Sequence, residues 1–269
     1  MTLLVGAIFP WQHLLDSPTF RALKQLSPAG GVIIAADSRW TYPDGRTEDG
    51  AVKLFGVGTN AIAAYAGSAI AGEDAIIGLS TRMKVSSTLH DFTSQTQAII
   101  AAAWGHHPDS HQDGLEVLLA YSYASGSAWL GHFSSTDDFA PHEDDDMTVI
   151  GPERARVHFQ QRLRAAVVQN LEGAKSQTTS LSIDSWAGLI VAAINDACEL
   201  RAHDTVGGRV LCGYTMLGRP QGLGVTRVSP RPSGPVVDEI GLDPGEARMV
   251  RTGWEYVPPA DDRDDEHGQ

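Results

Sequence analysis

The sequence predicts an α+β fold, a four-layer α-β-β-α sandwich of two antiparallel sheets, and two observations lead to it. Strand-like runs and helix-like segments follow one another in the order strands, two helices, strands, two helices, strands. Each sheet has to cover both of its faces, which a second sheet on the inside and paired helices on the outside achieve. The pattern alone leaves other α+β folds open.

The first half of the chain predicts one sheet and two helices. Apolar, β-rich runs bounded by turn residues are typical of strands, and apolar residues at helical spacing are typical of helices. Strands are expected at residues 2–8 and 31–37 and as two short strands within 53–67 around a turn at 58–60, and two helices between 68 and about 107, separated near 86–88.

The second half repeats this order. It predicts a hairpin over 115–135 that turns at 124–127, a strand at 147–151, helices at 152–172 and 182–201, and strands at 208–217 and 223–230. The acidic run from His142 to Asp146 is expected to be a solvated loop, with divalent-cation binding as the alternative.

Length and composition fit a single domain, which we place at residues 1–256. The chain has 269 residues and is 42% hydrophobic, so it can bury a sizeable core. The connection at 7–30 is long, and a short helix is expected in it, capped by Ser17 and started by Pro18. The tail at 257–269 is too polar and charged to pack, so we expect it to be disordered.

The charge balance excludes two classes of partner. Lys and Arg number 20 and Asp and Glu number 33, which gives a formal net charge of -13. Such a chain repels phosphate backbones and anionic lipid surfaces, so we expect neither nucleic acid nor membrane as a partner. The first apolar run lacks the basic flank and cleavage site of a signal peptide, and the cytoplasm is therefore the expected compartment.

No motif in the sequence points to a cofactor or to a metal. Cys198 and Cys212 lie in apolar segments outside any CxxC spacing and are interpreted as inert thiols. The segment at 106–113 reads HHPDSHQD; we interpret it as a solvated loop rather than a metal site. A GxxxxGK[ST] phosphate loop is absent, so any work driven by ATP would need a separate partner.

Asp37 and Lys53 are the first candidates for chemistry. Asp37 ends an apolar run that is expected to be buried, where an unpaired carboxylate is costly and requires a cation. Lys53 has apolar neighbours on both faces of a predicted strand, which is unusual for a solvated lysine. A paired, desolvated lysine can act on a neighbouring hydroxyl. The alternative is an edge lysine that reaches water and an aspartate in a turn.

Three consecutive motifs resemble the N-terminal motifs of proteasome β subunits and of the related bacterial ATP-dependent peptidase, which are N-terminal-nucleophile hydrolases. They read GGVIIAADSRWTYPDG, AVKLFGV and IAAYAGSAIAGEDAI. Lys53 follows Asp37, and Gly67 follows Lys53, at the spacing of that family without a gap. The resemblance continues more weakly through VIGPERA and RAHDTVGG, and so extends from Thr2 to about residue 225.

The resemblance implies a catalytic role for five residues. Removal of Met1 would free Thr2, whose hydroxyl would be the nucleophile and whose α-amine would be the base. Lys53 would lower the pKa of that hydroxyl, and Asp37 would hold Lys53. The backbone N–H of Gly67 would face the developing oxyanion. Asp204 would orient the amine of Thr2.

The resemblance also implies a substrate pocket and partners. Thr41 and Ala69 match positions that pair with the substrate backbone or flank the pocket, and Glu73 could add charge. Trp40, Phe55 and Tyr65 would make the primary side-chain pocket bulky. These bulky side chains suggest a preference for small or medium apolar residues. The implied substrate is an unfolded polypeptide, which would be cleaved inside a homo-oligomeric ring. A separate ATPase unfoldase could deliver the polypeptide to this ring. The resemblance implies no cofactor.

Two positions depart from the pattern of the family. Pro152 and Gly207 stand where the family usually has serines that hydrogen-bond around the threonine amine. Proline has no N–H and glycine has no hydroxyl, so the amine would depend on Asp204 and water. Two alternatives therefore stand beside the threonine peptidase: a catalytically silent structural subunit, and an N-terminal-nucleophile amidase that acts on a small molecule.

Overall fold

The computed structural model of the protein describes residues 2–9, 30–41, 45–49, 51–57, 61–83, 88–122, 128–143, 146–174, 183–199, 205–208, 210–216, 225–231, 234–240, 249–250 and 253–254. Five expectations lie outside these residues: the short helix near Ser17, the turns at 58–60 and 124–127, the position of Asp204, and the disordered tail at 257–269.

The first sheet is antiparallel and has the strand order β10-β1-β2-β11. Its strands are β1 (Leu4–Phe9), β2 (Gly31–Asp37), β10 (Met147–Ile150) and β11 (Val210–Met216). The central strands β1 and β2 pair over their whole length, from Leu4 opposite Ala36 to Phe9 opposite Gly31. The start of β1 and the end of β2 therefore lie side by side at one end of the sheet.

The second sheet is also antiparallel, with the order β5-β6-β7-β8-β9. Its strands are β5 (Leu54–Val57), β6 (Ala61–Gly67), β7 (Leu115–Ser122), β8 (Ala128–Ser134) and β9 (His142–Glu143). Shorter antiparallel pairs are formed by β3 (Arg39–Thr41) with β4 (Thr47–Asp49), β12 (Val225–Arg231) with β13 (Gly234–Ile240), and β14 (Met249–Val250) with β15 (Gly253–Trp254).

Two pairs of helices flank the sheets. They are α2 (Ala69–Arg82) with α3 (Leu89–His106), and α4 (Glu153–Ala174) with α5 (Ile183–Glu199). Ser68 and Thr88 cap the first pair, because their side-chain oxygens accept the N–H groups of Ala71 at 3.3 Å and Asp91 at 3.1 Å. Short 3-10 turns, η2 (Pro108–Asp113) and η3 (Ser135–Asp137), precede β7 and follow β8.

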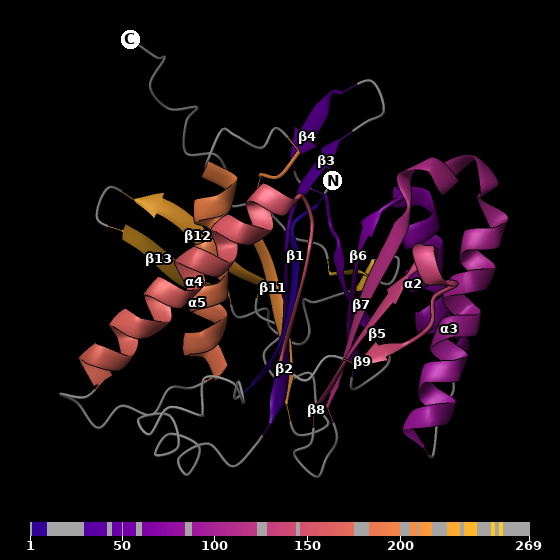
Figure 1. Ribbon diagram of the computed structural model, residues 1–269, viewed down its shortest axis with the longest axis horizontal. Coiled ribbons are helices and arrows are strands. Elements are labelled where there is room, and N and C mark those ends of the chain that lie inside the picture. The colour runs from indigo at the N-terminus through magenta and orange to yellow at the C-terminus, as the bar shows by residue number, and fades with distance from the viewer. Residues whose placement is uncertain are drawn as a thin grey trace.

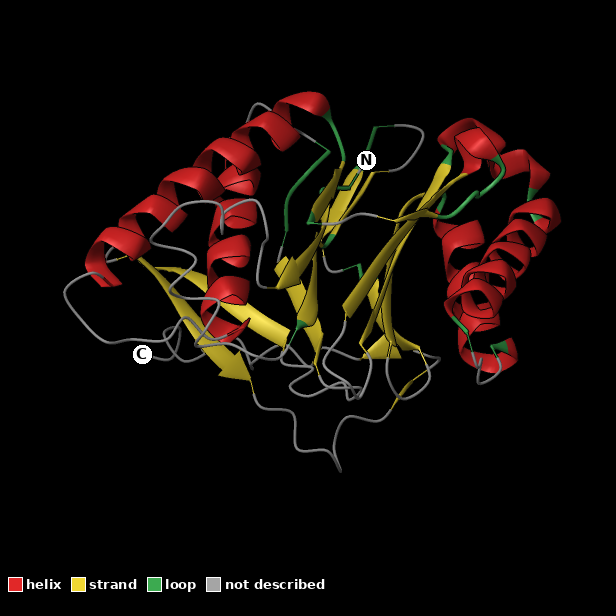
Figure 2. Cartoon of the chain, turned by 60° about the horizontal axis from the view of Figure 1, so that its bottom comes forward, coloured by secondary structure: helices red, strands yellow, loops and turns green. Residues whose placement is uncertain are grey.

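The layers follow the order helices, sheet, sheet, helices (Figures 1 and 2). The side chains at the start of the chain alternate between the two faces of the first sheet. Leu3, Val5 and Ala7 pack with α4 and α5, whereas Leu4 packs between the two sheets. A second core between the other sheet and α2 and α3 contains Tyr65. The α+β four-layer fold expected from the sequence is therefore confirmed.

The expected elements differ from the observed ones at three places. His142 and Glu143 form a two-residue strand against Gly131 and His132, so this part of the acidic run is an exposed edge strand and not a loop. The strand expected to include Lys53 begins one residue later. The strands β13 to β15 had no signal in the sequence pattern, because they lie in a segment rich in proline and glycine.

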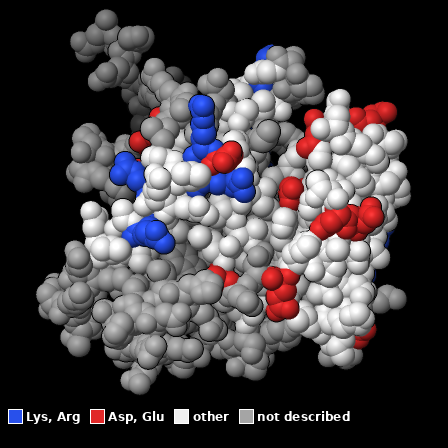
Figure 3. Space-filling model, in the orientation of Figure 1, with Lys and Arg blue, Asp and Glu red and all other residues white. Residues whose placement is uncertain are grey.

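Charge is spread unevenly over the surface. Figure 3 shows basic side chains mainly over the half of the molecule that contains α4, and acidic ones mainly over the half that contains α2 and α3. Exposed arginines of α4 are Arg154, Arg156, Arg162 and Arg164. Among the helices of the described residues, none is both long and apolar enough to cross a membrane.

Candidate active site

Thr2 stands at the end of a strand that is buried from its first residue. The side chains of Leu3 and Leu4 are fully buried, and Thr2 is 6% exposed. Leu3 packs into the core below α4 and α5, and Leu4 packs between the two sheets. The apolar run at the start of the sequence thus fixes Thr2 at the edge of the core.

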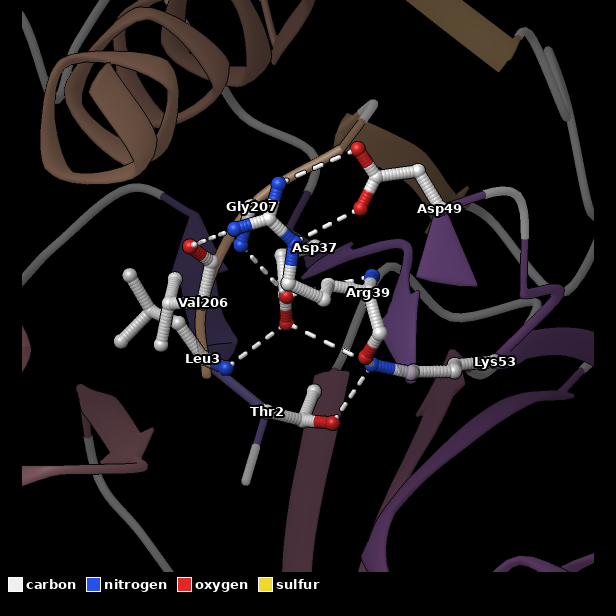
Figure 4. A network of polar contacts seen from close by, with 8 residues as sticks. All are labelled: Thr2, Leu3, Asp37, Arg39, Asp49, Lys53, Val206 and Gly207. Carbon is white, nitrogen blue, oxygen red and sulfur yellow. Dashed lines mark hydrogen bonds and ion pairs between the residues drawn. The ribbon is translucent and has the colours of Figure 1, made fainter. Parts of the chain in front are cut away.

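Asp37, the last residue of β2, holds several chain segments together. Within the described residues its carboxylate accepts three backbone N–H groups, those of Leu3 at 2.8 Å, Gly207 at 3.0 Å and Arg39 at 3.3 Å (Figure 4). Its own N–H donates to the carbonyl of Leu3 at 3.1 Å. Burial raises the pKa of this carboxyl, and Lys53 and the N–H donors act against that rise.

The ammonium of Lys53 lies among oxygen atoms. Nζ donates to Oγ1 of Thr2 at 2.6 Å and to the carbonyl oxygen of Arg39 at 2.5 Å. It also forms an ion pair with Oδ1 of Asp37 at 3.6 Å. Burial lowers the pKa of Lys53 below its ordinary value, and Asp37 opposes the change. The lysine is therefore a desolvated ammonium aimed at the threonine hydroxyl (Figure 4).

The exposure of the pair decides between the two interpretations left open by the sequence. The side chains of Lys53 and Asp37 are 4% and 0% exposed. An edge lysine that reaches water would leave its ammonium solvated. The structure thus places these two residues and Thr2 in one buried contact, at the end of the first sheet.

Gly67 lies at the end of β6, opposite Leu115, and its φ is +96°. A Cβ atom at this position would lie 2.3 Å from the carbonyl oxygen of Gly114. That carbonyl accepts the N–H of Ser68 at 2.8 Å, just before α2 begins. The glycine is required by this close approach of two backbones and by a φ that other residues rarely adopt. Gly67 is the one exposed residue of β6.

Gly151 brings the start of α4 against Thr2. Its φ is +139°, and a Cβ atom there would lie 2.7 Å from the carbonyl oxygen of Thr2. Pro152 follows, and its carbonyl accepts the N–H of Arg156 at 3.0 Å in the first turn of the helix. Pro152 is therefore the N-cap residue, just before α4 begins. The backbone of Gly151 and Pro152 next to Thr2 therefore has the conformation that begins α4.

The expected pocket residues come from four elements. Phe55 on β5 and Tyr65 on β6 stack at 6.0 Å between ring centroids. Trp40 and Thr41 lie on β3 and are half-buried, and Ala69 is the first residue of α2. Burial raises the pKa of the Tyr65 hydroxyl, which has no hydrogen-bond partner within the described residues. Phe55 and Tyr65 thus belong to the core between the second sheet and α2 and α3, and the expected charge, Glu73, is exposed on α2.

The histidines of the segment 106–113 contact other side chains of the protein. His106 and His107 both approach Oδ2 of Asp74 on α2, at 3.1 and 3.3 Å. His111 stacks on Trp104 with 4.1 Å between ring centroids. Among the described residues, no group of three or more potential ligands is arranged to hold a metal ion.

Both cysteines are free, and one of them lies near the site. Cys212 is buried, whereas Cys198 on α5 is partly exposed. Burial raises the pKa of the Cys198 thiol, and the nearby charge of Asp37 adds to this effect. A thiol in this state is a poor nucleophile.

Sequence reasoning missed Arg39 and Asp49. The guanidinium of Arg39 makes two hydrogen bonds to the carboxylate of Asp49, at 2.7 and 3.1 Å. Its Nη1 donates to the carbonyl of Val206 at 3.5 Å. The signal available was an arginine two residues after Asp37, in a run otherwise free of basic residues.

The four-layer α+β fold of this protein is also found in solved structures. Two solved structures are similar to it: an Anbu (Gly-1) mutant from Hyphomicrobium sp. strain MC1, at 14% identity, and Anbu, described as an ancestral beta-subunit, from Yersinia bercovieri, at 12%. Each has a TM-score of 0.54 and covers 81% of this chain and 84% of its own. The sequence matches no protein-family model and no curated protein.

Proposed function

We propose that this protein is an N-terminal threonine peptidase that hydrolyses peptide bonds of unfolded polypeptides. One observation carries the proposal: the Lys53 ammonium donates to the Thr2 hydroxyl at 2.6 Å in a buried setting. A lysine beside Asp37 lowers the pKa of a hydroxyl that it contacts, and a threonine hydroxyl is otherwise a weak nucleophile. Removal of Met1 would supply the second requirement, a free α-amine.

In the proposed reaction, Oγ1 of Thr2 attacks the carbonyl carbon of the scissile bond. The hydroxyl proton passes to the α-amine, which has an ordinary pKa of about 7.7 to 8.0 and is substantially neutral near that pH. The oxyanion faces the N–H of Gly67, a contact typically worth about 3 to 4 kcal/mol. The C–N bond breaks as the departing amine takes the proton, leaving an ester on Thr2. Water then hydrolyses the ester and restores the hydroxyl.

The proposal includes a homo-oligomeric ring that encloses the site. Among the described residues, the large hydrophobic side chains that are exposed lie on outer helices, Ile70 and Ile77 on α2 and Val157 and Val168 on α4. Acidic residues flank the first pair and arginines the second. Apolar patches with charges of opposite sign on opposite sides of one molecule suit a repeated contact between copies. The native mass of the purified protein tests the ring.

Thr2→Ala is the central test of the peptidase. It should abolish turnover of fluorogenic peptides without loss of folding, because it removes only the hydroxyl and one methyl group. Thr215→Ala is the matched control, since Thr215 is a fully buried threonine on β11 whose hydroxyl has no hydrogen-bond partner in the described part of the chain. Unchanged turnover in Thr2→Ala would refute the proposal, as would an intact mass that retains Met1.

A silent structural subunit is the second candidate, and Pro152 favours it. This proline offers neither an N–H nor a hydroxyl beside Thr2, where a threonine amine would need partners. The two candidates differ in their reaction with an epoxyketone-type probe, which requires both the hydroxyl and the free amine. Labelling of Thr2 supports the peptidase, and a ring that is never labelled supports the structural subunit. A monomer or dimer that hydrolyses small amides would instead indicate an amidase.

A further inference from the structure

The backbone of Arg39 joins the two charged residues of the site. Its N–H donates to Oδ2 of Asp37 at 3.3 Å, and its carbonyl accepts the Lys53 ammonium at 2.5 Å. The same residue therefore contacts both partners of the buried ion pair. Any movement of its backbone would change the position of Lys53 relative to Thr2.

The side chain of Arg39 connects β3 with β4 and with the segment 205–208. Nε and Nη2 donate to the two carboxylate oxygens of Asp49, at 2.7 and 3.1 Å, and Nη1 reaches the carbonyl of Val206 at 3.5 Å (Figure 4). A two-point contact of this kind fixes geometry as well as charge. The side chains of Arg39 and Asp49 are 25% and 49% exposed, so the ion pair adds little to the free energy of unfolding. Its main effect is to fix the positions of the segments that it joins.

The backbone of the segment 205–208 lies directly against this pair. A Cβ atom at Gly207 would lie 2.4 Å from the central carbon of the Arg39 guanidinium. At Gly208, where φ is +78°, a Cβ atom would lie 3.1 Å from the carboxylate of Asp49. The guanidinium thus occupies the space that a side chain at 207 would need.

Gly207 in turn completes the site. Its N–H donates to Oδ2 of Asp37 at 3.0 Å, and Gly207 is buried. We propose that the Arg39–Asp49 pair is a positioning device that holds Gly207 against Asp37, and that glycine at 207 is a requirement of this device. This inference deepens the proposed function and, for its kinetic part, rests on it.

The resemblance and the geometry around Gly207 predict opposite effects of Gly207→Ser on turnover. If Gly207 were only a serine that has been lost, Gly207→Ser would give the Thr2 amine another partner and raise turnover. If the guanidinium needs the space, the same change displaces Arg39 and the segment 205–208. We expect kcat to fall about 10-fold to 100-fold, as for a displacement of about 1 Å in a catalytic site. KM should change little, because Arg39 supports Lys53 and not the substrate.

A double-mutant cycle tests the device in the full-length protein. Arg39→Ala should lower kcat by a similar factor, and Gly207→Ser should cost clearly less in the Arg39→Ala background than alone. Arg39→Lys keeps the charge without the two-point contact and should not restore kcat. Arg162→Ala is the matched control, because Arg162 forms an exposed ion pair with Asp196 at 3.2 Å on the outer helices.

A measurement that needs no turnover separates this inference from the proposed function. The Gly207 amide should exchange its hydrogen about 10-fold faster in Arg39→Ala than in the wild type, at an unchanged free energy of unfolding. If exchange at Gly207 is unchanged, or Gly207→Ser raises kcat, the inference is wrong. If the wild type hydrolyses no peptide, the proposed function fails, and the exchange result still decides whether Arg39 positions Gly207.

Discussion

The Lys53 ammonium lies 2.6 Å from the Thr2 hydroxyl, although 51 positions separate the two residues in the sequence. Both residues are buried, and the lysine reaches the hydroxyl from the start of β5 in the second sheet, whereas Thr2 precedes β1 in the first. The contact therefore crosses the interface between the sheets. It exists only when both sheets are formed and packed.

Loss of Lys53 should weaken the fold as well as the reaction. Lys53→Met leaves the fully buried Asp37 carboxylate without its cation, which typically costs about 3 to 5 kcal/mol in the free energy of unfolding. Urea denaturation measures this cost. Thr2→Val is the control, because it removes the hydroxyl but keeps the ion pair and should cost less. Equal losses in the two variants would contradict the prediction.

The pH dependence of kcat/KM should reveal the lowered pKa of Lys53. Burial lowers this pKa below the ordinary 10.5, while Asp37, Cys198 and Asp49 oppose the shift. Because the ammonium has to donate to Thr2, kcat/KM should fall with rising pH already below pH 10.5. A profile that stays level beyond pH 10.5 would contradict this.

The free energy of unfolding over the same pH range serves as a control. Between the lowered pKa and 10.5, the folded protein holds fewer protons on Lys53 than the unfolded chain does. The unfolded state binds more protons, so this group makes the free energy of unfolding rise with pH. A fall in kcat/KM in that window can therefore not be caused by unfolding linked to Lys53.

Gly67 and Gly105 should respond in opposite ways to alanine. Gly67→Ala places a Cβ atom 2.3 Å from the Gly114 carbonyl at a φ of +96°, which should cost about 1 to 3 kcal/mol and reduce turnover. Gly105 on α3 has open space around it, and Gly105→Ala should be neutral or stabilise by up to about 1 kcal/mol. Thermal unfolding of both variants is the measurement, and a stable, active Gly67→Ala would refute the role of this glycine.

Removal of the Tyr65 hydroxyl should not destabilise the protein. This hydroxyl is buried and has no partner within the described residues, so Tyr65→Phe should be neutral or stabilise by about 1 kcal/mol. Tyr65→Ala should instead cost about 3 to 5 kcal/mol, because it leaves a cavity beside Phe55. If Tyr65 lines the substrate pocket, Tyr65→Ala should also raise kcat/KM for peptides with larger side chains at the cleavage site. A loss of stability in Tyr65→Phe would show that the hydroxyl has a partner.

Much of the architecture could be read from local patterns. The continuous apolar, β-rich runs of β1, β2 and β6 and the helical spacing around Ile76 and Ile100 were enough to place these elements within a few residues. The strand expected at 223–230 corresponds to β12, whereas the strands after β12 were not predicted. That segment is rich in proline and glycine, and β13 itself begins with Gly234 and Pro235.

The sequence by itself determined the order of strands and helices, the burial of the first run, and the need of Asp37 for a cation, because these depend on the polarity and spacing of nearby residues. The resemblance of the motifs implied that the cation is Lys53 and that it acts on Thr2, and the tertiary structure shows both contacts. Only the tertiary structure decided that Arg39 fills the space beside Gly207. Such contacts arise where segments distant in the sequence are pressed together, and no local pattern encodes which atoms then meet.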